Sequence, residues 1–241
     1  MGAPNMVDAA TFFDTLWIIE SVRSDELKTG RLLYETVSDD ARNSKLKVHF
    51  ERPTSTSEIL AALDRVRIHQ SHPMLHFECH GSPSGLQAAD GGLISWSELR
   101  KPLITINEGC GLNLVVVMAS CNGSHLIKTA TRLDKAPFWA VIGPDEEVTA
   151  GQCERDFTRF YQEFFRSFDG DKAIAALNEN STACCHPEPL YRFVNAESIF
   201  IRAFAKYYQN HCRGAGKRRR RGTSEQGNAG GQTSFLGPHT T

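Results

Sequence analysis

The chain has 241 residues, of which 40% are hydrophobic and 23% are charged. This composition suits one sizeable domain or two small ones, and it excludes a collagen, a mini-protein and a wholly disordered chain. The longest unbroken apolar run, residues 114–119, is far shorter than the ~20 residues of a spanning helix, so we expect no membrane partner.

The formal net charge of -1 conceals two parts of opposite charge. Residues 213–241 hold six basic side chains and one acidic side chain, whereas residues 1–212 hold 21 basic and 27 acidic ones. Gly, Ser, Thr, Gln and Arg dominate the last part, which predicts a folded domain over 1–212 and a disordered basic tail over 213–241. The run KRRRR, residues 217–221, suits nucleic acid, an acidic partner, a trafficking receptor or a protease; a solvated tail explains it equally well. Because no aromatic residues interleave with it, we expect no nucleic-acid partner beyond this tail.

Seven cysteines form an odd set without the spacing of a disulfide framework, which is typical of a reducing compartment. No basic residue precedes Phe12, and Asp14 interrupts the apolar stretch of residues 12–19, so we expect no signal peptide. The sequence therefore predicts a cytoplasmic protein.

Strand-like and helix-like patterns alternate along the chain. Strands are predicted at 17–22, 46–50, 74–79, 112–119 and 138–142, of which 17–22 and 112–119 are expected to be buried. Helices are predicted at 25–37, from 55, from 124, at 153–168 and at 171–177. This alternation predicts an α/β fold, a three-layer α/β/α sandwich with a mostly parallel central sheet.

Three helix patterns are specific enough to name residues. In the first helix, Leu27, Leu32 and Leu33 are expected near one face. The sequence Ser-Thr-Ser-Glu at residues 55–58 predicts a capping box at the start of the second. In helix 153–168 an aromatic stripe is predicted to cover the sheet; its members are Phe157, Phe160, Tyr161, Phe164, Phe165 and Phe168.

Two predicted strands end in residues that can do chemistry. His80 and Gly81 follow strand 74–79, and Cys121 follows strand 112–119, just before the helix predicted from Ser124. The carboxyl ends of parallel strands meet at one edge of a sheet, where ligands bind. The partial positive charge of a helix N-terminus favours a thiolate, so Cys121 is a candidate nucleophile and His80 its candidate base. Taken singly, Cys121 is more simply explained as a buried structural cysteine, and His80-Gly81 as a turn.

These residues resemble the caspase-like cysteine peptidases, most closely their CHAT branch. The resemblance rests on His80-Gly81, on the segment DGGLISWSEL (90–99), and on Ala-Ser-Cys-Asn-Gly (119–123); it extends over about 12–180. It implies that 1–212 is a CHAT peptidase domain of three-layer fold. It also implies that His80 and Cys121 are base and nucleophile, and that the N–H groups of Gly81 and Cys121 form the oxyanion hole. Asn122 departs from the Glu that CHAT sequences often have here, which leaves the regulation open.

The segment GPDEE, residues 143–147, follows the strand after the cysteine. Relatives draw the walls of the substrate pocket from this region, so Asp145, Glu146 and Glu147 are candidate pocket residues for an Arg or Lys side chain. A capped helix start or an exposed loop explains the same acids. If the pocket is acidic, the chain's own KRRRR run becomes a candidate autoprocessing site.

Other clusters favour simpler explanations. His76, Glu78 and His80 share one face of a strand while Cys79 faces the other, and Cys184, Cys185 and His186 are adjacent rather than spaced as zinc ligands are, so we expect no metal. Glu78 is a candidate for orienting His80, although a solvated or paired carboxylate explains it as well.

The sequence thus predicts a cysteine endopeptidase that hydrolyses protein substrates through a Cys-His dyad and a thioester, without a cofactor. By resemblance, an activating partner protein and a role in defence or regulated cell death are implied. The alternative is a catalytically idle caspase-like module that acts as a scaffold or binds a partner.

Overall fold

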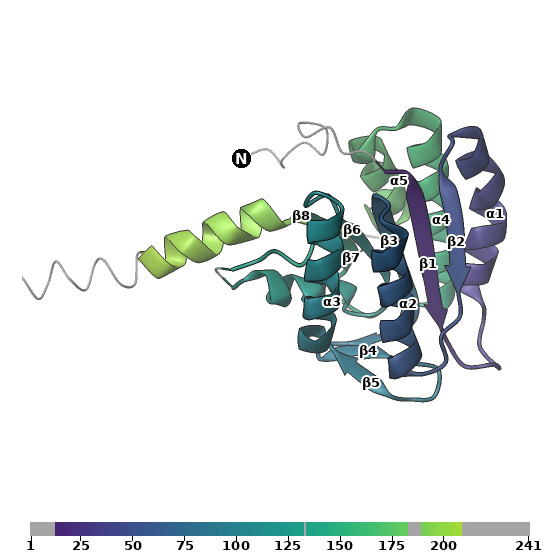
Figure 1. Cartoon of the computed structure of the whole chain (residues 1–241). Coiled ribbons are helices and arrows are strands. Elements are labelled where there is room, and N and C mark those ends of the chain that lie inside the picture. Colours follow the sequence, from purple (N-terminus) through teal and green to yellow (C-terminus); the bar gives the residue numbers. More distant parts are fainter. Residues whose placement is uncertain (1–12, 133, 183–188, 209–241) are drawn as a thin grey trace, which may run out of the picture. The chain divides into compact units, whose positions relative to one another are not determined.

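A computed structural model describes residues 13–132, 134–182 and 189–208 of the chain (Figure 1). The chain divides into two compact units, Met1–Ile201 and Arg202–Thr241. The predicted tail, 213–241, lies outside the described residues. None of the helices in the described part combines the length and apolarity that crossing a bilayer requires.

The first unit is built on a sheet with strand order β2-β1-β3-β6-β7-β8. Five strands run parallel: β1 (Thr15–Ser21), β2 (Lys47–Glu51), β3 (Pro73–Ser82), β6 (Val115–Ala119) and β7 (Ala140–Pro144). The edge strand β8 (Tyr191–Asn195) runs antiparallel to β7, and the short strands β4 (Gly85–Gln87) and β5 (Leu93–Ser95) extend the end of β3 as a hairpin. The mostly parallel sheet confirms the predicted α/β class.

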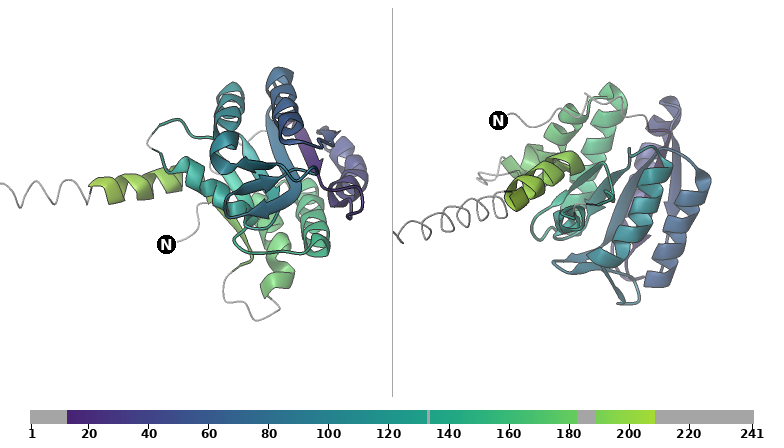
Figure 2. Two further views of the ribbon diagram at one scale, coloured as in Figure 1. Left: turned by 90° about the horizontal axis from the view of Figure 1, so that it is seen from below. Right: turned by 60° about the vertical axis from the view of Figure 1, so that its left-hand side comes forward.

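Helices cover both faces of the sheet (Figures 1 and 2). One apolar cluster joins the sheet to α1 (Thr29–Asn43), α4 (Ala150–Ser167) and α5 (Gly170–Thr182). The other joins it to α2 (Thr56–His69), α3 (Trp96–Gly109) and the 3₁₀ helix η1 (Gly123–Ala130). Side chains of β6 enter both clusters, as expected of a central parallel strand. The three-layer sandwich is confirmed.

The aromatic stripe of α4 covers one face of the sheet, as predicted. Phe157, Phe160 and Tyr161 are fully buried, and Phe164 and Phe165 are nearly so. Phe168 is the exception, because the helix ends at Ser167 and Phe168 takes a left-handed conformation with its side chain 62% exposed.

The first helix begins later than predicted. It starts at Thr29 instead of residue 25, which leaves Leu27 in the preceding loop and Leu32 on the solvent side, while Leu33 and Val37 face the sheet. Leu27 and Leu32 are therefore not partners of Leu33 on one buried face. The pattern was ambiguous because leucines spaced by five and six residues fit more than one helical phase.

Other boundaries follow from tertiary contacts. β3 runs past Cys79 to Ser82 because its last residues pair with β4. The helix predicted from Ser124 is a 3₁₀ helix of eight residues. Ser55 is the N-cap of α2, where its hydroxyl accepts from the Glu58 N–H, but the Glu58 carboxylate accepts from Thr54 instead of closing the box. The helix α3 was not predicted, although Ser95 and Glu98 form a complete capping box at its start.

We expect Phe157→Ala to lower the free energy of unfolding by about 3–5 kcal/mol, because it removes a fully buried ring and leaves a cavity. The same truncation at Phe168 is the matched control and should change stability by less than about 0.5 kcal/mol. Urea unfolding of both variants measures the difference. Equal losses would contradict the packing described here.

Candidate active site

The sheet brings His80 and Cys121 to the same level on neighbouring strands. Partners in the parallel pair β3–β6 differ by 41 residues, from Met74 opposite Val115 to Glu78 opposite Ala119. His80 and Cys121 differ by the same number and lie two residues beyond the last pair of this register. Adjacent strands lie about 4.8 Å apart, so the register alone sets the two residues side by side at the carboxyl edge.

Both side chains line a cavity of about 220 Å³ at this edge. Its wall also includes Glu26 and Leu27 from the loop after β1, Val148 from the loop before α4, and Cys153 from the first turn of α4. The lining therefore comes from the ends of β1, β3 and β6 and from the segment after β7, which is where an open α/β sheet binds ligands.

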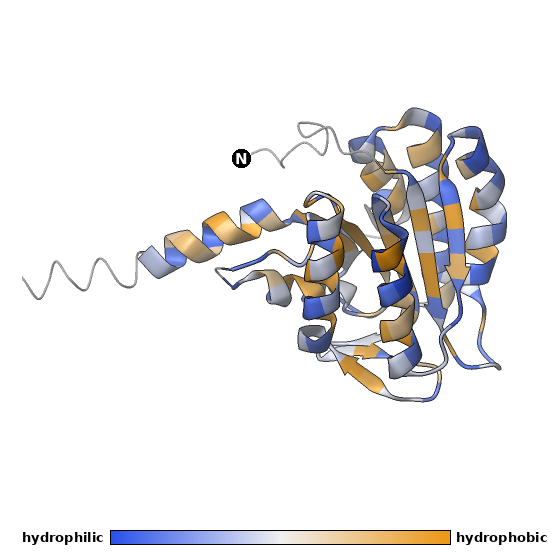
Figure 3. Ribbon diagram, in the orientation of Figure 1, coloured by the Kyte–Doolittle hydropathy of each residue, from blue (hydrophilic) through white to orange (hydrophobic). Residues whose placement is uncertain are grey.

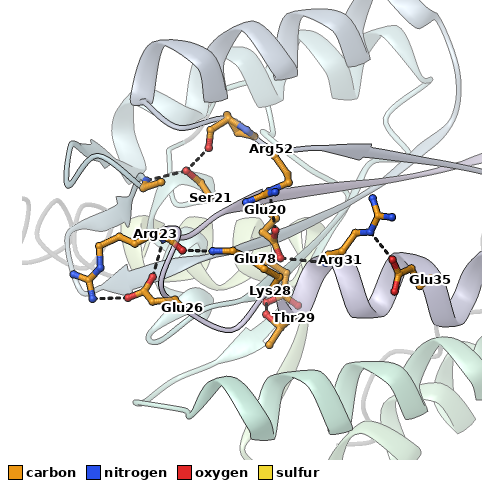
Figure 4. A network of polar contacts seen from close by, with 12 residues as sticks. Glu20, Ser21, Arg23, Glu26, Lys28, Thr29, Arg31, Glu35, Arg52 and Glu78 are labelled. Carbon is orange, nitrogen blue, oxygen red and sulfur yellow. Dashed lines mark hydrogen bonds and ion pairs between the residues drawn. The ribbon is translucent and has the colours of Figure 1, made fainter.

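Glu26 positions the His80 ring. The Nε2 atom of His80 lies 2.9 Å from Glu26 Oε1, and Arg23 contacts the same carboxylate through its backbone N–H at 2.8 Å and its guanidinium at 2.6 Å. Figure 4 shows Arg23 and Glu26 facing each other in the loop after β1. Desolvation by itself raises the pKa of Glu26, but the bonds from Arg23 and His80 outweigh it and hold the pKa below its ordinary value.

The thiol of Cys121 is held by backbone groups. Its Sγ atom lies 3.4 Å from both the carbonyl oxygen and the amide nitrogen of Val148, the residue before the N-cap of α4. The cysteine is half-buried, whereas the His80 side chain is 51% exposed. Among the described residues no hydrogen bond joins His80 to Cys121.

Gly81 lies directly against the peptide of Cys121. A Cβ atom built at Gly81 would stand 2.0 Å from the carbonyl oxygen of Cys121, so a side chain cannot be accommodated without moving β3 or the segment after β6. Asn122 then takes a left-handed conformation and donates its N–H to the Glu146 carbonyl at 3.0 Å. The structure brings His80, Gly81 and Cys121 together, all within one edge of the sheet.

Glu78 does not contact His80. It lies beneath the cavity, where its carboxylate accepts from the Thr29 hydroxyl at 2.7 Å and lies 3.0 Å from Nε2 of the fully buried His76. His76 in turn contacts the Tyr161 hydroxyl at 3.0 Å. Glu78 is therefore a paired carboxylate. His76 joins it to Tyr161 in one buried series of polar contacts.

A second buried carboxylate neighbours Glu78. Glu20 stands opposite it in the β1–β3 register, accepts from the Arg31 N–H at 3.1 Å and lies 3.3 Å from the Arg52 guanidinium (Figure 4). Burial raises the pKa of Glu20 above its ordinary value. Gly30, in the first turn of α1, lies directly against these acids, since a Cβ there would stand 3.0 Å from Glu78 Cγ and 3.1 Å from Glu20 Cβ.

The three acids after β7 directly precede Val148, which lines the cavity. Asp145 is bound by the Arg192 guanidinium at 2.5 Å and by the Ser124 hydroxyl. Glu146 and Glu147 are exposed. Among the described residues, none of these three acids lines the cavity itself.

No group of three His, Cys, Asp or Glu side chains in the described part of the chain is arranged to hold a metal. Cys79 faces the apolar cluster opposite His76, as the strand alternation predicts. Cys184, Cys185 and His186 lie outside the described residues.

The sequence reasoning missed two partners in this site, Glu26 and Val148. Glu26 was assigned to a helix, although an acid just after the strand beside β3 reaches the same sheet edge. Nothing in the sequence marks Val148, because its backbone and not its side chain contacts the thiol.

No family model matches the sequence, and no curated protein matches it. Among solved structures the chain is similar to the crystal structure of the Arg-specific cysteine proteinase gingipain R, with 10% sequence identity and a TM-score of 0.47. The match covers 71% of this chain and 43% of that one, so the chain spans less than half of that protein's length.

Iodoacetamide should alkylate Cys121 faster than the other described cysteines near neutral pH. Burial raises the pKa of Cys79 to about 12 and also raises the pKa of Cys110 and Cys153, so these three are neither accessible nor thiolate. Peptide mapping by mass spectrometry gives the order of labelling. Uniform labelling of the four in the folded protein would contradict this assignment.

Proposed function

We propose that this chain is a caspase-like cysteine peptidase, of the CHAT type, that cleaves protein substrates. The observation that carries the proposal is the strand register, which sets His80 beside Cys121 in one cavity with Glu26 bound to the ring. A nucleophile, a base and a group that orients the base are the components of a thiol peptidase site.

The proposed reaction starts from the contacts that His80 and Cys121 make in this structure. With Nε2–H donated to Glu26, the lone pair of the His80 ring is on Nδ1, which takes the proton of the Cys121 thiol once that side chain leaves Val148. The thiolate sulfur attacks the scissile carbonyl carbon, and the carbonyl π electrons move to oxygen. The N–H groups of Gly81 and Cys121 are proposed to stabilise this oxyanion.

The tetrahedral intermediate collapses when the C–N bond breaks and His80 gives its proton to the leaving amine, which leaves a thioester on Cys121. A water molecule then loses a proton to His80 as its oxygen attacks the thioester carbon. When this second tetrahedral intermediate collapses, the C–S bond breaks, the carboxylic acid departs, and the proton held by His80 returns to the Cys121 sulfur. The Glu26 carboxylate would stabilise the imidazolium in both halves of the reaction.

The loop after β7 is proposed to select a basic side chain on the substrate. The bond from Asn122 N–H to the Glu146 carbonyl ties this loop to the residue after the nucleophile. Since Asp145 is engaged by Arg192, Glu146 and Glu147 would supply the negative charge. We further propose a cytoplasmic peptidase that acts in defence or cell death on few substrates.

One observation favours the second function, a catalytically idle module that binds a partner. The thiol is bonded to Val148 instead of His80, so the dyad is not assembled in this structure. An activating partner that shifts the start of α4 would reconcile the two functions, because that shift would release Cys121.

Cleavage of pooled fluorogenic peptides distinguishes these functions. We expect Cys121→Ala to abolish cleavage and His80→Ala to lower kcat/KM on the order of 100-fold or more. Cys110→Ala is the matched control, since Cys110 ends α3 in the opposite apolar cluster and should leave the rate unchanged. Equal cleavage by the unaltered chain and Cys121→Ala would remove the peptidase proposal.

Glu26→Gln should lower kcat on the order of 10- to 100-fold with KM little changed, because the ring loses its charged orienting partner. Glu26→Asp should recover part of the rate, which a merely structural role would not predict. Glu35→Gln removes an exposed carboxylate that pairs with Arg31 on α1 and serves as control. A Glu26→Gln variant with full activity would show that His80 needs no such partner.

A further inference from the structure

Two cysteines, Cys121 and Cys153, line the cavity from the same side of the sheet. The Sγ atom of Cys121 contacts the backbone of Val148 at 3.4 Å, and Val148 packs against the apolar cluster that α4 forms with the sheet. Cys153, in the first turn of α4, belongs to the same cluster. Cys79 also lines the cavity, but it belongs to the cluster on the opposite face. Cys153 is therefore the cysteine that shares a side of the sheet with the candidate nucleophile.

The start of α4 directs the Cys153 side chain toward the segment that holds the Cys121 thiol. Thr149 is the N-cap of the helix, and the Cys153 N–H donates to its carbonyl at 3.0 Å. The Cα–Cβ bonds of an α-helix tilt toward its N-terminus, so the Cys153 side chain leans toward Thr149 and Val148. The helices that cover the sheet mix hydrophilic and hydrophobic residues (Figure 3), and the buried side of α4 begins with Cys153. Segment 148–153 thus contacts one thiol at its first residue and carries the other at its last.

The two thiols differ in their access to the cavity opening. Cys121 is half-buried, whereas Cys153 is only 4% exposed. Burial, and after it the charges of Glu78 and Cys121, raise the pKa of Cys153 well above its ordinary value. A small oxidant that enters the cavity therefore reacts with Cys121 first and leaves Cys153 as a thiol beside it. A buried cysteine on its own is an inert apolar residue, and it is the second thiol in the same cavity that gives Cys153 a reaction partner.

We propose that Cys121 and Cys153 form a reversible disulfide when the protein meets a hydroperoxide. The Cys121 sulfur attacks one oxygen of the hydroperoxide, the O–O bond breaks, and the thiol proton leaves with the other oxygen as water or an alcohol. The sulfur is oxidised to a sulfenic acid and the hydroperoxide is reduced. The Cys153 sulfur then attacks the sulfenic sulfur, the S–O bond breaks, and the hydroxyl group leaves with the Cys153 proton as water.

The disulfide would store the nucleophile in an inactive form that a thiol reductant restores. This consequence for activity rests on the proposed peptidase function, whereas formation of the disulfide does not. Without Cys153, further hydroperoxide would oxidise the sulfenic acid of Cys121 to a sulfinic acid, which thiol reductants do not reverse. Cys153 would therefore protect Cys121 as well as switch it off.

The test is treatment of the reduced full chain with hydrogen peroxide near neutral pH. The remaining thiols are then blocked under denaturing conditions, and peptides are mapped without reduction by mass spectrometry. We expect a cross-link between the peptides that carry Cys121 and Cys153, and its loss on treatment with dithiothreitol. In Cys153→Ala, the amount of Cys121 that dithiothreitol returns to the thiol should fall on the order of tenfold, because sulfinic acid accumulates.

Cys110→Ala and Cys79→Ala are the matched controls. Cys110 ends α3 away from the cavity lining, and Cys79 lines the cavity from the opposite face, so both variants should form the cross-link as the unaltered chain does. Circular dichroism checks the fold of each variant, and the cross-link itself is measured in the unaltered chain. Three results would overturn the proposal: no cross-link of Cys121, a cross-link of Cys121 to another cysteine in place of Cys153, or equal recovery of the Cys121 thiol with and without Cys153.

The cross-link and peptide cleavage are separate measurements. A chain that forms the cross-link but cleaves no peptide contradicts the peptidase proposal and supports the disulfide. A chain that cleaves peptides but forms no cross-link contradicts the disulfide and leaves the peptidase proposal standing. In an active chain, we expect hydrogen peroxide to abolish cleavage and dithiothreitol to restore most of it.

Discussion

The parallel pairing of β3 with β6 is the constraint on which the candidate site depends. Its register places residues 41 apart at the same level, and this holds for the last paired residues as well as for His80 and Cys121 just beyond them. A shift of one residue would turn either side chain to the other face of the sheet. Gly81 completes the arrangement, because only a residue without Cβ lets β3 lie against the Cys121 peptide.

Buried acids beneath the cavity connect the site to the helices that cover it. Glu20 and Glu78 lie side by side on β1 and β3, under the first turn of α1, where Arg31 N–H and the Thr29 hydroxyl bind them. Buried carboxylates are costly unless they are bonded in this way. Through His76 the same chain reaches Tyr161 on α4, whose pKa burial raises. The floor of the cavity is thereby fixed by polar contacts from both α1 and α4.

The contacts of the thiol and the imidazole differ in kind. His80 is bound by a side chain, Glu26, in a loop that Arg23 holds, whereas Cys121 is bound by the backbone of Val148. The first contact suits a base that is ready to act. The second holds the Cys121 side chain beside α4, so a displacement of Val148 would change the contacts of the cysteine without altering the sheet.

The sequence by itself determined the α/β class, the three layers, the strands that carry His80 and Cys121, and the aromatic cover of α4, because each depends on local periodicity and on the rule that parallel strands end at one edge. Only the tertiary structure decided the partners. Glu26 contacts His80 from a loop 54 residues away in the chain. Glu78 contacts His76 instead of His80, and Asp145 forms an ion pair with Arg192. The contacts of Glu26 and Asp145 join segments distant in the chain, and strand order and register, which no local pattern encodes, decide which segments meet. Glu78 and His76 are neighbours on β3, but the Thr29 hydroxyl that binds the same carboxylate comes from α1.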